Sequence, residues 1–108
     1  GDDIRDLIYI DDFIDAMIVA AEKIVTYDPI NIGYGKGYSI KEILQMCLEI
    51  DGYSDAVVEY DITKPSMIPV RLIDVEKAKS LLGFEAGTGI REGIRKTMEW
   101  YRANCQRA

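Results

Sequence analysis

The chain has 108 residues, and its 19 acidic side chains against 13 basic ones give a formal net charge of −6 at pH 7. This balance disfavours nonspecific nucleic-acid binding, which depends on clustered Lys and Arg side chains that neutralise phosphates. Histidine is absent, which removes His-based acid–base catalysis and most transition-metal sites. No apolar run approaches the roughly 18 residues that a membrane-spanning helix needs.

The first third of the chain predicts strand, helix and strand. Residues 4–10 are apolar and partly β-branched, which indicates a strand. A helix capped by Asp11 or Asp12 follows and runs to about Lys23, with its apolar positions at helical spacing. Two adjacent carboxylates could also hold a metal or act in acid–base chemistry, but their place before an apolar-periodic run favours the cap. Residues 30–32 are expected to form a short strand.

The middle of the chain predicts a loop, a helix and a third strand. Residues 34–38 contain G-x-G, which on its own is a turn and lacks the spacing of a phosphate-binding loop. Ser39 and Glu42 form the pattern of a capping box, so a helix is expected to begin there. It should end near Gly52, since glycine tolerates the left-handed conformation of a helix C-terminus. A strand is expected over 56–60.

The last third predicts an extended segment and two more helices. Residues 64–69 hold two prolines and should be extended, and 70–73 could pair briefly in a sheet. Asp74 is expected to cap a short helix over 75–82, and a final helix should start after Gly89. Because helices and short strands alternate, the fold class is α/β, a small single domain of 1–108.

Two cysteines, Cys47 and Cys105, form no metal-ligand or redox spacing. Cys47 falls on the apolar face of the helix that begins near Ser39. A buried thiol in a reducing cytoplasm is therefore the preferred interpretation, and a cytoplasmic location is expected.

Two arginines stand out because each lies near the start of a predicted strand. A guanidinium at a strand end can reach a cleft and hold a phosphate through two hydrogen bonds, which Lys does less well. Alternatively, each arginine pairs with a nearby carboxylate, such as Asp74 or Glu76 in the case of Arg71. The residues alone leave both readings open.

Several stretches together resemble the carboxyl-terminal part of nucleotide-sugar epimerases and dehydratases, the extended short-chain dehydrogenase/reductases. In chain order they are R-D-x-I-Y-x-D-D at 5–12, N-I-G at 31–33, S-I-K-E-I-L at 39–44, R-L-I-D-V-E-K-A-K-S-L-L-G-F at 71–84 and E-G-I-R-K-T-M-E-W-Y at 92–101. Residues 64–74 show a slight resemblance to the GDP-fucose synthase branch of this family.

The resemblance implies a division of labour between two halves of an enzyme. It implies a Rossmann domain that holds NAD or NADP and a Tyr-Lys acid–base pair, and a smaller substrate domain built largely from the carboxyl-terminal third. In such enzymes arginines matching Arg5, and near the position of Arg71, contact the substrate diphosphate. We therefore expect a nucleotide-diphosphate sugar as the ligand, Arg5 and Arg71 as substrate-binding residues, and no catalytic, cofactor-binding or metal-binding residue in this chain.

The sequence thus predicts the substrate-binding part of an NAD(P)-dependent nucleotide-sugar epimerase, dehydratase or reductase, inactive alone and lacking its amino-terminal Rossmann half. The chain opens Gly1-Asp2-Asp3 without an initiator Met, which we interpret as a piece of a longer protein. We expect no tyrosine here to stand in for the acid–base pair. A homodimer is one option for the whole enzyme. The alternative is a stand-alone binding or interaction module without catalysis, or a purely structural piece.

Overall fold

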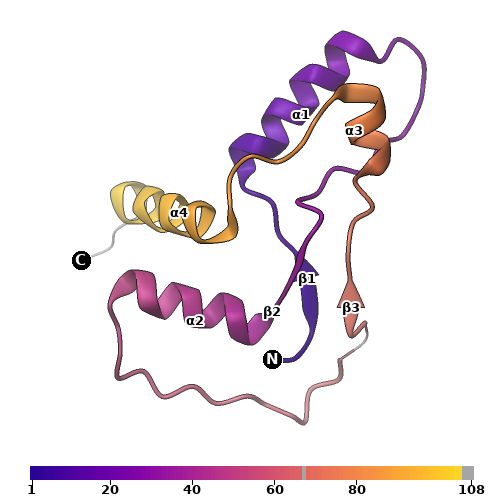
Figure 1. Ribbon diagram of the computed structural model, residues 1–108. Helices are drawn as coiled ribbons and strands as arrows, with labels where there is room; N and C mark the ends of the chain where they lie inside the picture. The colour runs from indigo at the N-terminus through magenta and orange to yellow at the C-terminus, as the bar shows by residue number, and fades with distance from the viewer. Residues whose placement is uncertain (67, 106–108) are drawn as a thin grey trace.

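A computed structural model of the chain describes residues 1–66 and 68–105. Its elements in chain order are β1 (Ile4–Asp6), α1 (Ile10–Lys23), β2 (Gly37–Ser39), α2 (Ile40–Asp51), β3 (Val70–Arg71), α3 (Glu76–Leu82) and α4 (Ile90–Asn104) (Figure 1). The expected α/β class is confirmed.

Strand β1 lies at the centre of a three-stranded sheet with the order β2-β1-β3. It pairs antiparallel with β2 and parallel with β3, and Arg5 is the register partner of both Tyr38 and Arg71. The backbone N–H of Ile4 also donates to the carbonyl of Pro69 at 2.8 Å. The expected pairing of residues near 70–73 is thus made by Val70 and Arg71.

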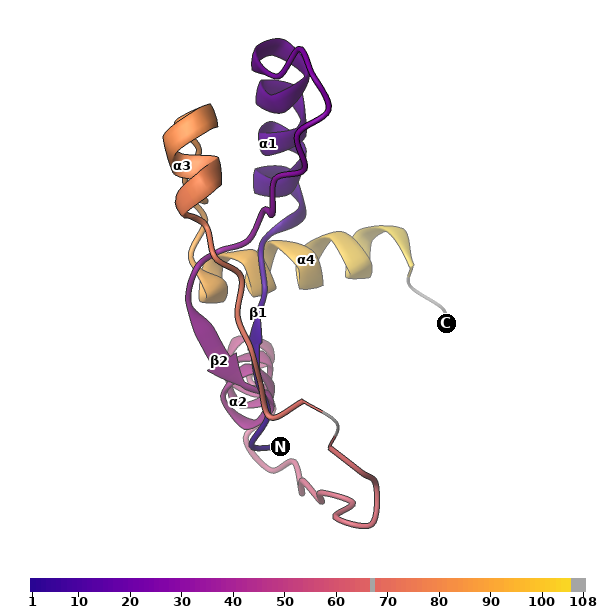
Figure 2. The same cartoon turned by 90° about the vertical axis from the view of Figure 1, so that its right-hand side faces the viewer.

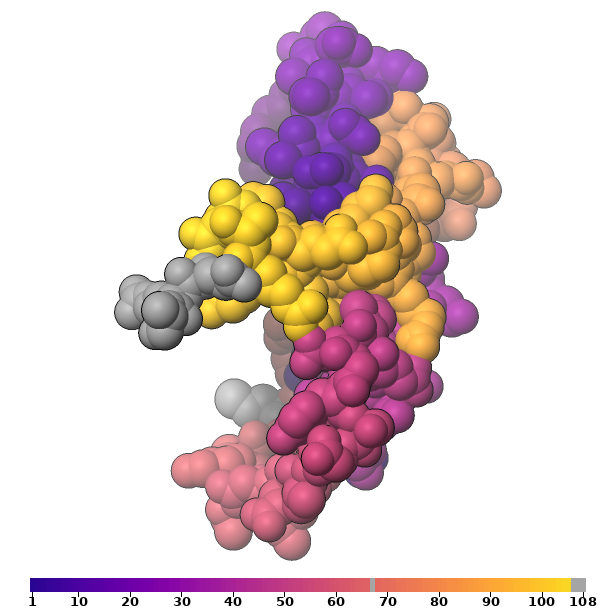
Figure 3. Space-filling model, turned by 90° about the vertical axis from the view of Figure 1, so that its left-hand side faces the viewer, coloured from indigo at the N-terminus to yellow at the C-terminus, as the bar shows by residue number. Residues whose placement is uncertain are grey.

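The sheet connects two groups of helices. Helices α1 and α3 pack together at one end, while α2 and the long loop after it lie at the other (Figures 1 and 2). Helix α4 lies between these two parts (Figure 3) and is tied to α2 by ion pairs of Arg91 with Glu49 and Arg102 with Asp51.

The molecule is elongated and leaves much apolar surface uncovered. Its radius of gyration is 16.6 Å, against about 13 Å for a compact domain of this length. It exposes 8126 Å², whereas a folded monomer of 12.2 kDa exposes roughly 6,000 Å². In the described part of the chain the buried apolar residues are Ala16, Ala78 and Leu82, at the contact of α1 with α3. The core is therefore small.

Helix α2 begins and ends as its sequence indicates. The Ser39 hydroxyl accepts from the backbone N–H of Glu42 at 3.1 Å, and the Glu42 carboxylate accepts from the backbone N–H of Ser39 at 2.7 Å. Gly52 closes the helix with a φ of 72°, and Gly83 closes α3 in the same way with a φ of 64°. The predicted capping box is confirmed, as are both glycine ends.

The expected N-cap of α1 is wrong. The strand before it ends at Asp6 rather than running to residue 10, and the helix begins at Ile10 with Tyr9 in the cap position. Neither carboxylate caps the helix. Asp12 instead accepts from the backbone N–H of Thr88 at 2.8 Å and from the Thr88 hydroxyl at 3.1 Å, so it joins α1 to the start of α4.

Two other expected strands do not form. Residues 30–32 and 56–60 are not in strands, although their residue types favour extended backbone. A strand needs a neighbour for its hydrogen bonds, and within residues 1–66 and 68–105 neither segment has one. Helix α3 begins one residue later than expected, at Glu76, and Val75 rather than Asp74 holds the cap position. The backbone N–H of Glu76 donates to the Asp74 carboxylate at 3.0 Å. In the expected extended segment over 64–69, Met67 lies outside the described residues.

Replacing Ser39 with Ala should lower the free energy of unfolding by about 1 kcal/mol, because the N–H of Glu42 loses its acceptor. Denaturant titration of the protein measures the change. The matched control is Ser80→Ala on the exposed side of α3, which removes a hydroxyl that caps nothing and should shift the midpoint little. Equal midpoints for Ser39→Ala and the unchanged protein would contradict the capping role.

Candidate functional site

Three side chains of the site lie in one row across the sheet. Tyr38 on β2, Arg5 on β1 and Arg71 on β3 occupy neighbouring register positions. Because residues opposite each other on adjacent strands project to the same face, these three share one side of the sheet. The structure therefore brings together the two arginines that the sequence singled out and adds Tyr38 to them.

The other face of the sheet confirms this assignment. A side chain added at Gly37 would collide with Ile4 and Leu72, each one residue away from a member of the row. Side chains alternate between faces along a strand, so Ile4 and Leu72 lie opposite the arginines. Glycine at position 37 lets these two apolar side chains close over β2.

The two arginines differ in their partners. Arg5 donates to the backbone carbonyl of Ile4 at 2.8 Å, and its guanidinium lies 3.6 Å from the Asp3 carboxylate. Arg71 is exposed, and no described carboxylate lies within 4.0 Å of it. The ion pair with Asp74 or Glu76 that the sequence left open is not formed among these residues.

The loop before β2 carries a third cation to this region. The ammonium group of Lys36 lies 5.2 Å from the centre of the Tyr38 ring. Nothing in the sequence pointed to this pair, because the placement of Tyr38 beside Arg5 depends on the register of β2 against β1.

Asp6 fixes the position of that loop. Its carboxylate accepts from the backbone N–H groups of Tyr34 and Gly35, each at 2.8 Å. Gly35 has a φ of 87°, a conformation that favours glycine. The G-x-G of this loop thus forms a turn held by a carboxylate, rather than a cradle for an anion. Sequence reasoning missed Asp6, whose only signal was its place beside Arg5.

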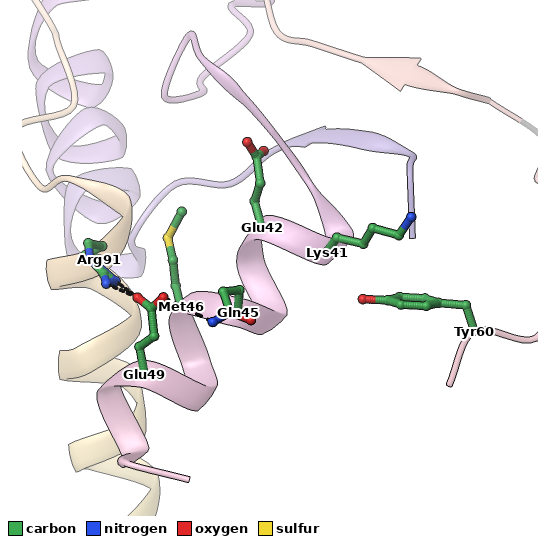
Figure 4. A pocket seen from close by; sticks show the side chains of 7 residues that line it. All are labelled: Lys41, Glu42, Gln45, Met46, Glu49, Tyr60 and Arg91. Carbon is green, nitrogen blue, oxygen red and sulfur yellow. Dashed lines mark hydrogen bonds and ion pairs between the residues drawn. The ribbon is translucent and has the colours of Figure 1, made fainter. Parts of the chain in front are cut away.

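Two of the cavities in the described part of the chain lie away from this row. The larger, of about 600 Å³, borders α2 and includes Lys41, Tyr60 and Arg91 (Figure 4). Its cations already have partners, since Arg91 pairs with Glu49 and Lys41 pairs with Asp2, an interaction that lowers the pKa of the Asp2 carboxyl.

The second cavity, of about 430 Å³, is mainly apolar and lies where α1, α2 and α4 approach one another. Cys47 lines it and is half-buried with a free thiol, rather than fully buried as expected. Tyr9 lines it as well, and partial desolvation raises the pKa of this tyrosine. Neither cavity gathers unpaired charge as the row does.

One tyrosine, Tyr60, has a lysine four residues on, Lys64, which is the spacing of the Tyr-Lys acid–base pair that we expect to lie in the other half of the enzyme. The segment is not helical. Asp61 accepts from the backbone N–H of Thr63 at 3.0 Å, which folds it into a turn. Residues four apart share a face only on a helix, so the spacing carries no paired chemistry here.

The described part of the chain can also be searched for metal sites and for membrane-spanning helices. Among residues 1–66 and 68–105, no group of three or more His, Cys, Asp or Glu side chains could hold a metal ion. No helix there is both long enough and apolar enough to cross a membrane.

We compared the chain with known proteins by sequence and by structure. No family model matches the chain. It is 31% identical over 104 residues to a protein described as putative GDP-L-fucose synthase 2 of Arabidopsis thaliana, covering 96% of this chain and 31% of the relative. It is 35% identical over 107 residues to UDP-glucuronate 4-epimerase of Thermodesulfobacterium geofontis, covering 98% and 32%. The chain spans about a third of the length of the curated relatives it matches.

Solved structures that resemble this chain include two nucleotide-sugar enzymes. The UDP-glucose 4-epimerase of Thermotoga maritima, crystallised with UDP-glucose, superposes with a TM-score of 0.84 at 30% identity, covering 98% of this chain and 34% of that one. The dTDP-glucose 4,6-dehydratase of Bacillus anthracis, in complex with NAD, gives a TM-score of 0.85 at 23% identity, covering 96% and 33%. At that identity the likeness shows the fold alone.

Replacing Asp6 with Ala should release the loop at Tyr34 and Gly35, because both backbone N–H groups lose a charged acceptor. We expect their amide hydrogens to exchange faster and the free energy of unfolding to fall by about 1.5–2 kcal/mol, the lower part of the range for charged acceptors. Hydrogen exchange followed by NMR measures the first effect. Asp15→Ala, an exposed carboxylate on α1, is the control. Unchanged exchange at Gly35 in the Asp6 variant would refute the tie.

Proposed function

We infer that this chain is a homologue of the nucleotide-sugar epimerases and dehydratases of the extended short-chain dehydrogenase/reductase family. We propose that it is the substrate-binding part of such an enzyme. Its ligand is a nucleotide-diphosphate sugar, and Arg5 and Arg71 bind the diphosphate. The rest of the enzyme, an amino-terminal Rossmann half, holds NAD or NADP.

The row across the sheet supports the diphosphate assignment most directly. Arg5 and Arg71 are register partners on adjacent strands, an arrangement in which like charges repel. One carboxylate, Asp3, approaches Arg5, and none of the described carboxylates approaches Arg71. A diphosphate placed over the row would remove this repulsion and receive planar guanidinium donors on both sides. The chain has a net charge of −6, so a local group of neighbouring cations favours a site for an anionic ligand.

The exposed apolar surface supports a missing half. On α1 the side chains of Ile10, Ile14, Met17 and Ile18 keep helical spacing and are between 43% and 58% exposed. Residues 30–32 have the composition of a strand but no partner strand in the described chain. A further domain packed on α1 would cover the apolar stripe, and a sheet beside residues 30–32 would supply the missing hydrogen bonds.

The chemistry follows from this division. NAD or NADP, bound in the other half, supplies the acceptor and donor of a hydride. This chain orients the sugar by holding the diphosphate, so that the reacting carbon is presented at a fixed position. Its own residues take no proton or hydride. The alternative of a stand-alone binding module predicts the same row with no cofactor half attached.

Arg71→Ala in the intact protein that contains this chain should weaken nucleotide-sugar binding about 10- to 150-fold, because a charged hydrogen bond contributes about 1.5–3 kcal/mol. Affinity for NAD or NADP should stay nearly unchanged. Calorimetry with UDP-glucose and with GDP-L-fucose measures the effect on whichever binds. Arg71→Lys should recover part of the loss, since the charge returns without the planar fork.

The matched control is Arg95→Ala, whose partners Glu92 and Glu99 lie on its own helix. It should leave affinity unchanged. If neither nucleotide sugar binds the intact protein, or if the folded Arg71→Ala variant binds as well as the unchanged protein, the assignment is lost.

The isolated 108 residues should show no saturable binding of NAD or NADP. Dinucleotide binding needs a glycine-rich turn and a helix amino terminus around the pyrophosphate, and this chain has no G-x-G-x-x-G. Calorimetry with each dinucleotide tests it, with the intact protein as positive control. Saturable binding by the isolated chain at micromolar dinucleotide would contradict the division into halves.

A further inference from the structure

We propose that Lys36, held in place by the ring of Tyr38, is a third cation of the diphosphate-binding face and contacts the phosphate farther from Arg71. This proposal rests on the proposed function and deepens it, because it assigns a residue on β2 and its loop to the same ligand.

The geometry places Lys36 at one end of the row. Tyr38 flanks Arg5 on the β2 side, while Arg71 flanks it on the β3 side. Neighbouring strands lie about 4.8 Å apart, so the row extends roughly 10 Å across the sheet. With its ammonium 5.2 Å from the Tyr38 ring centre, Lys36 lies at the end away from Arg71. Arg5 is then the middle cation of three.

The backbone around Lys36 is fixed. Asp6 holds the two preceding residues through their N–H groups at 2.8 Å, and β2 begins immediately after it, at Gly37. A lysine anchored on both sides loses less freedom when it binds an anion than one on an untethered loop.

The charge of Lys36 is what separates it from similar lysines. Three lysine–tyrosine stacks occur in the described chain: Lys36 on Tyr38, Lys41 on Tyr60 and Lys96 on Tyr9. Lys41 also pairs with Asp2 at 2.8 Å, and Lys96 with Glu92 at 3.9 Å. No described carboxylate lies within 4.0 Å of Lys36.

An aromatic ring and an ammonium attract each other without neutralising the charge. Tyr38 therefore positions the lysine and leaves its charge available to a ligand. The Tyr38 hydroxyl makes no hydrogen bond to another described residue, so the ring is the part of Tyr38 that positions Lys36.

The role makes a specific demand on the ligand. A nucleoside diphosphate has two phosphates, and one cation beyond the arginines is placed for the second of them. Lys36 should therefore favour nucleoside diphosphates over monophosphates. A lysine that is merely a solvated surface charge would make no such distinction.

The test uses the intact protein and measures the dissociation constants of UDP, UMP, GDP and GMP by calorimetry at fixed salt. Lys36→Met keeps the length of the side chain and removes its charge. We expect it to weaken binding of the diphosphate about 3- to 10-fold, less than loss of an arginine because the ammonium lacks the planar fork. Binding of the matching monophosphate should change less than twofold.

Variants of Tyr38 separate ring from hydroxyl. Tyr38→Leu should weaken diphosphate binding about 2- to 5-fold, the effect of an exposed cation–π contact, while Tyr38→Phe should leave it unchanged. The control is Lys41→Met, which removes the lysine of a matched stack whose charge already has a partner. Thermal melts of each variant confirm that it is folded.

The outcomes are distinguishable. If Lys36→Met binds UDP and GDP as the unchanged protein does while Arg71→Ala binds them weakly, this inference fails and the proposed function stands. Loss of affinity in Tyr38→Phe equal to that in Tyr38→Leu would overturn the role of the ring. If Arg71→Ala also binds normally, the proposed function itself fails.

Discussion

The pairing of β1 with both of its neighbours is the constraint on which the rest of this structure depends. The three residues Ile4–Asp6 pair with β2 on one side, and Ile4 and Arg5 pair with β3 on the other. Their alternation sends Arg5 to one face and Asp6 to the other. One short strand therefore places the central cation of the candidate site and also, through Asp6, holds the loop that carries Lys36.

The described part of the chain also has only a small apolar core. In the described part of the chain the buried apolar side chains are those of Ala16, Ala78 and Leu82, at the contact of α1 with α3. An extended molecule with exposed apolar helix faces gains little stability from burial. The chain spans about a third of the length of the relatives that it matches.

Helix ends could be predicted from the sequence where residues within one helical turn determine them. Ser39 and Glu42 satisfy each other's backbone groups across three residues, and Gly52 and Gly83 relieve the left-handed backbone at two helix ends. Asp12 shows the limit. Its position before an apolar run is that of a cap, but the carboxylate finds Thr88, 76 residues away, and the helix begins without it.

The sequence by itself determined the α/β class, the ends of α2, the acidic balance of the chain and the two arginines as candidates for a phosphate. The tertiary structure alone decided that Arg5, Arg71 and Tyr38 form one row, that Lys36 joins it, and that residues 30–32 and 56–60 stay unpaired. The reason is physical. A helix satisfies its own backbone, whereas strand pairing and register depend on which distant segment supplies the hydrogen bonds.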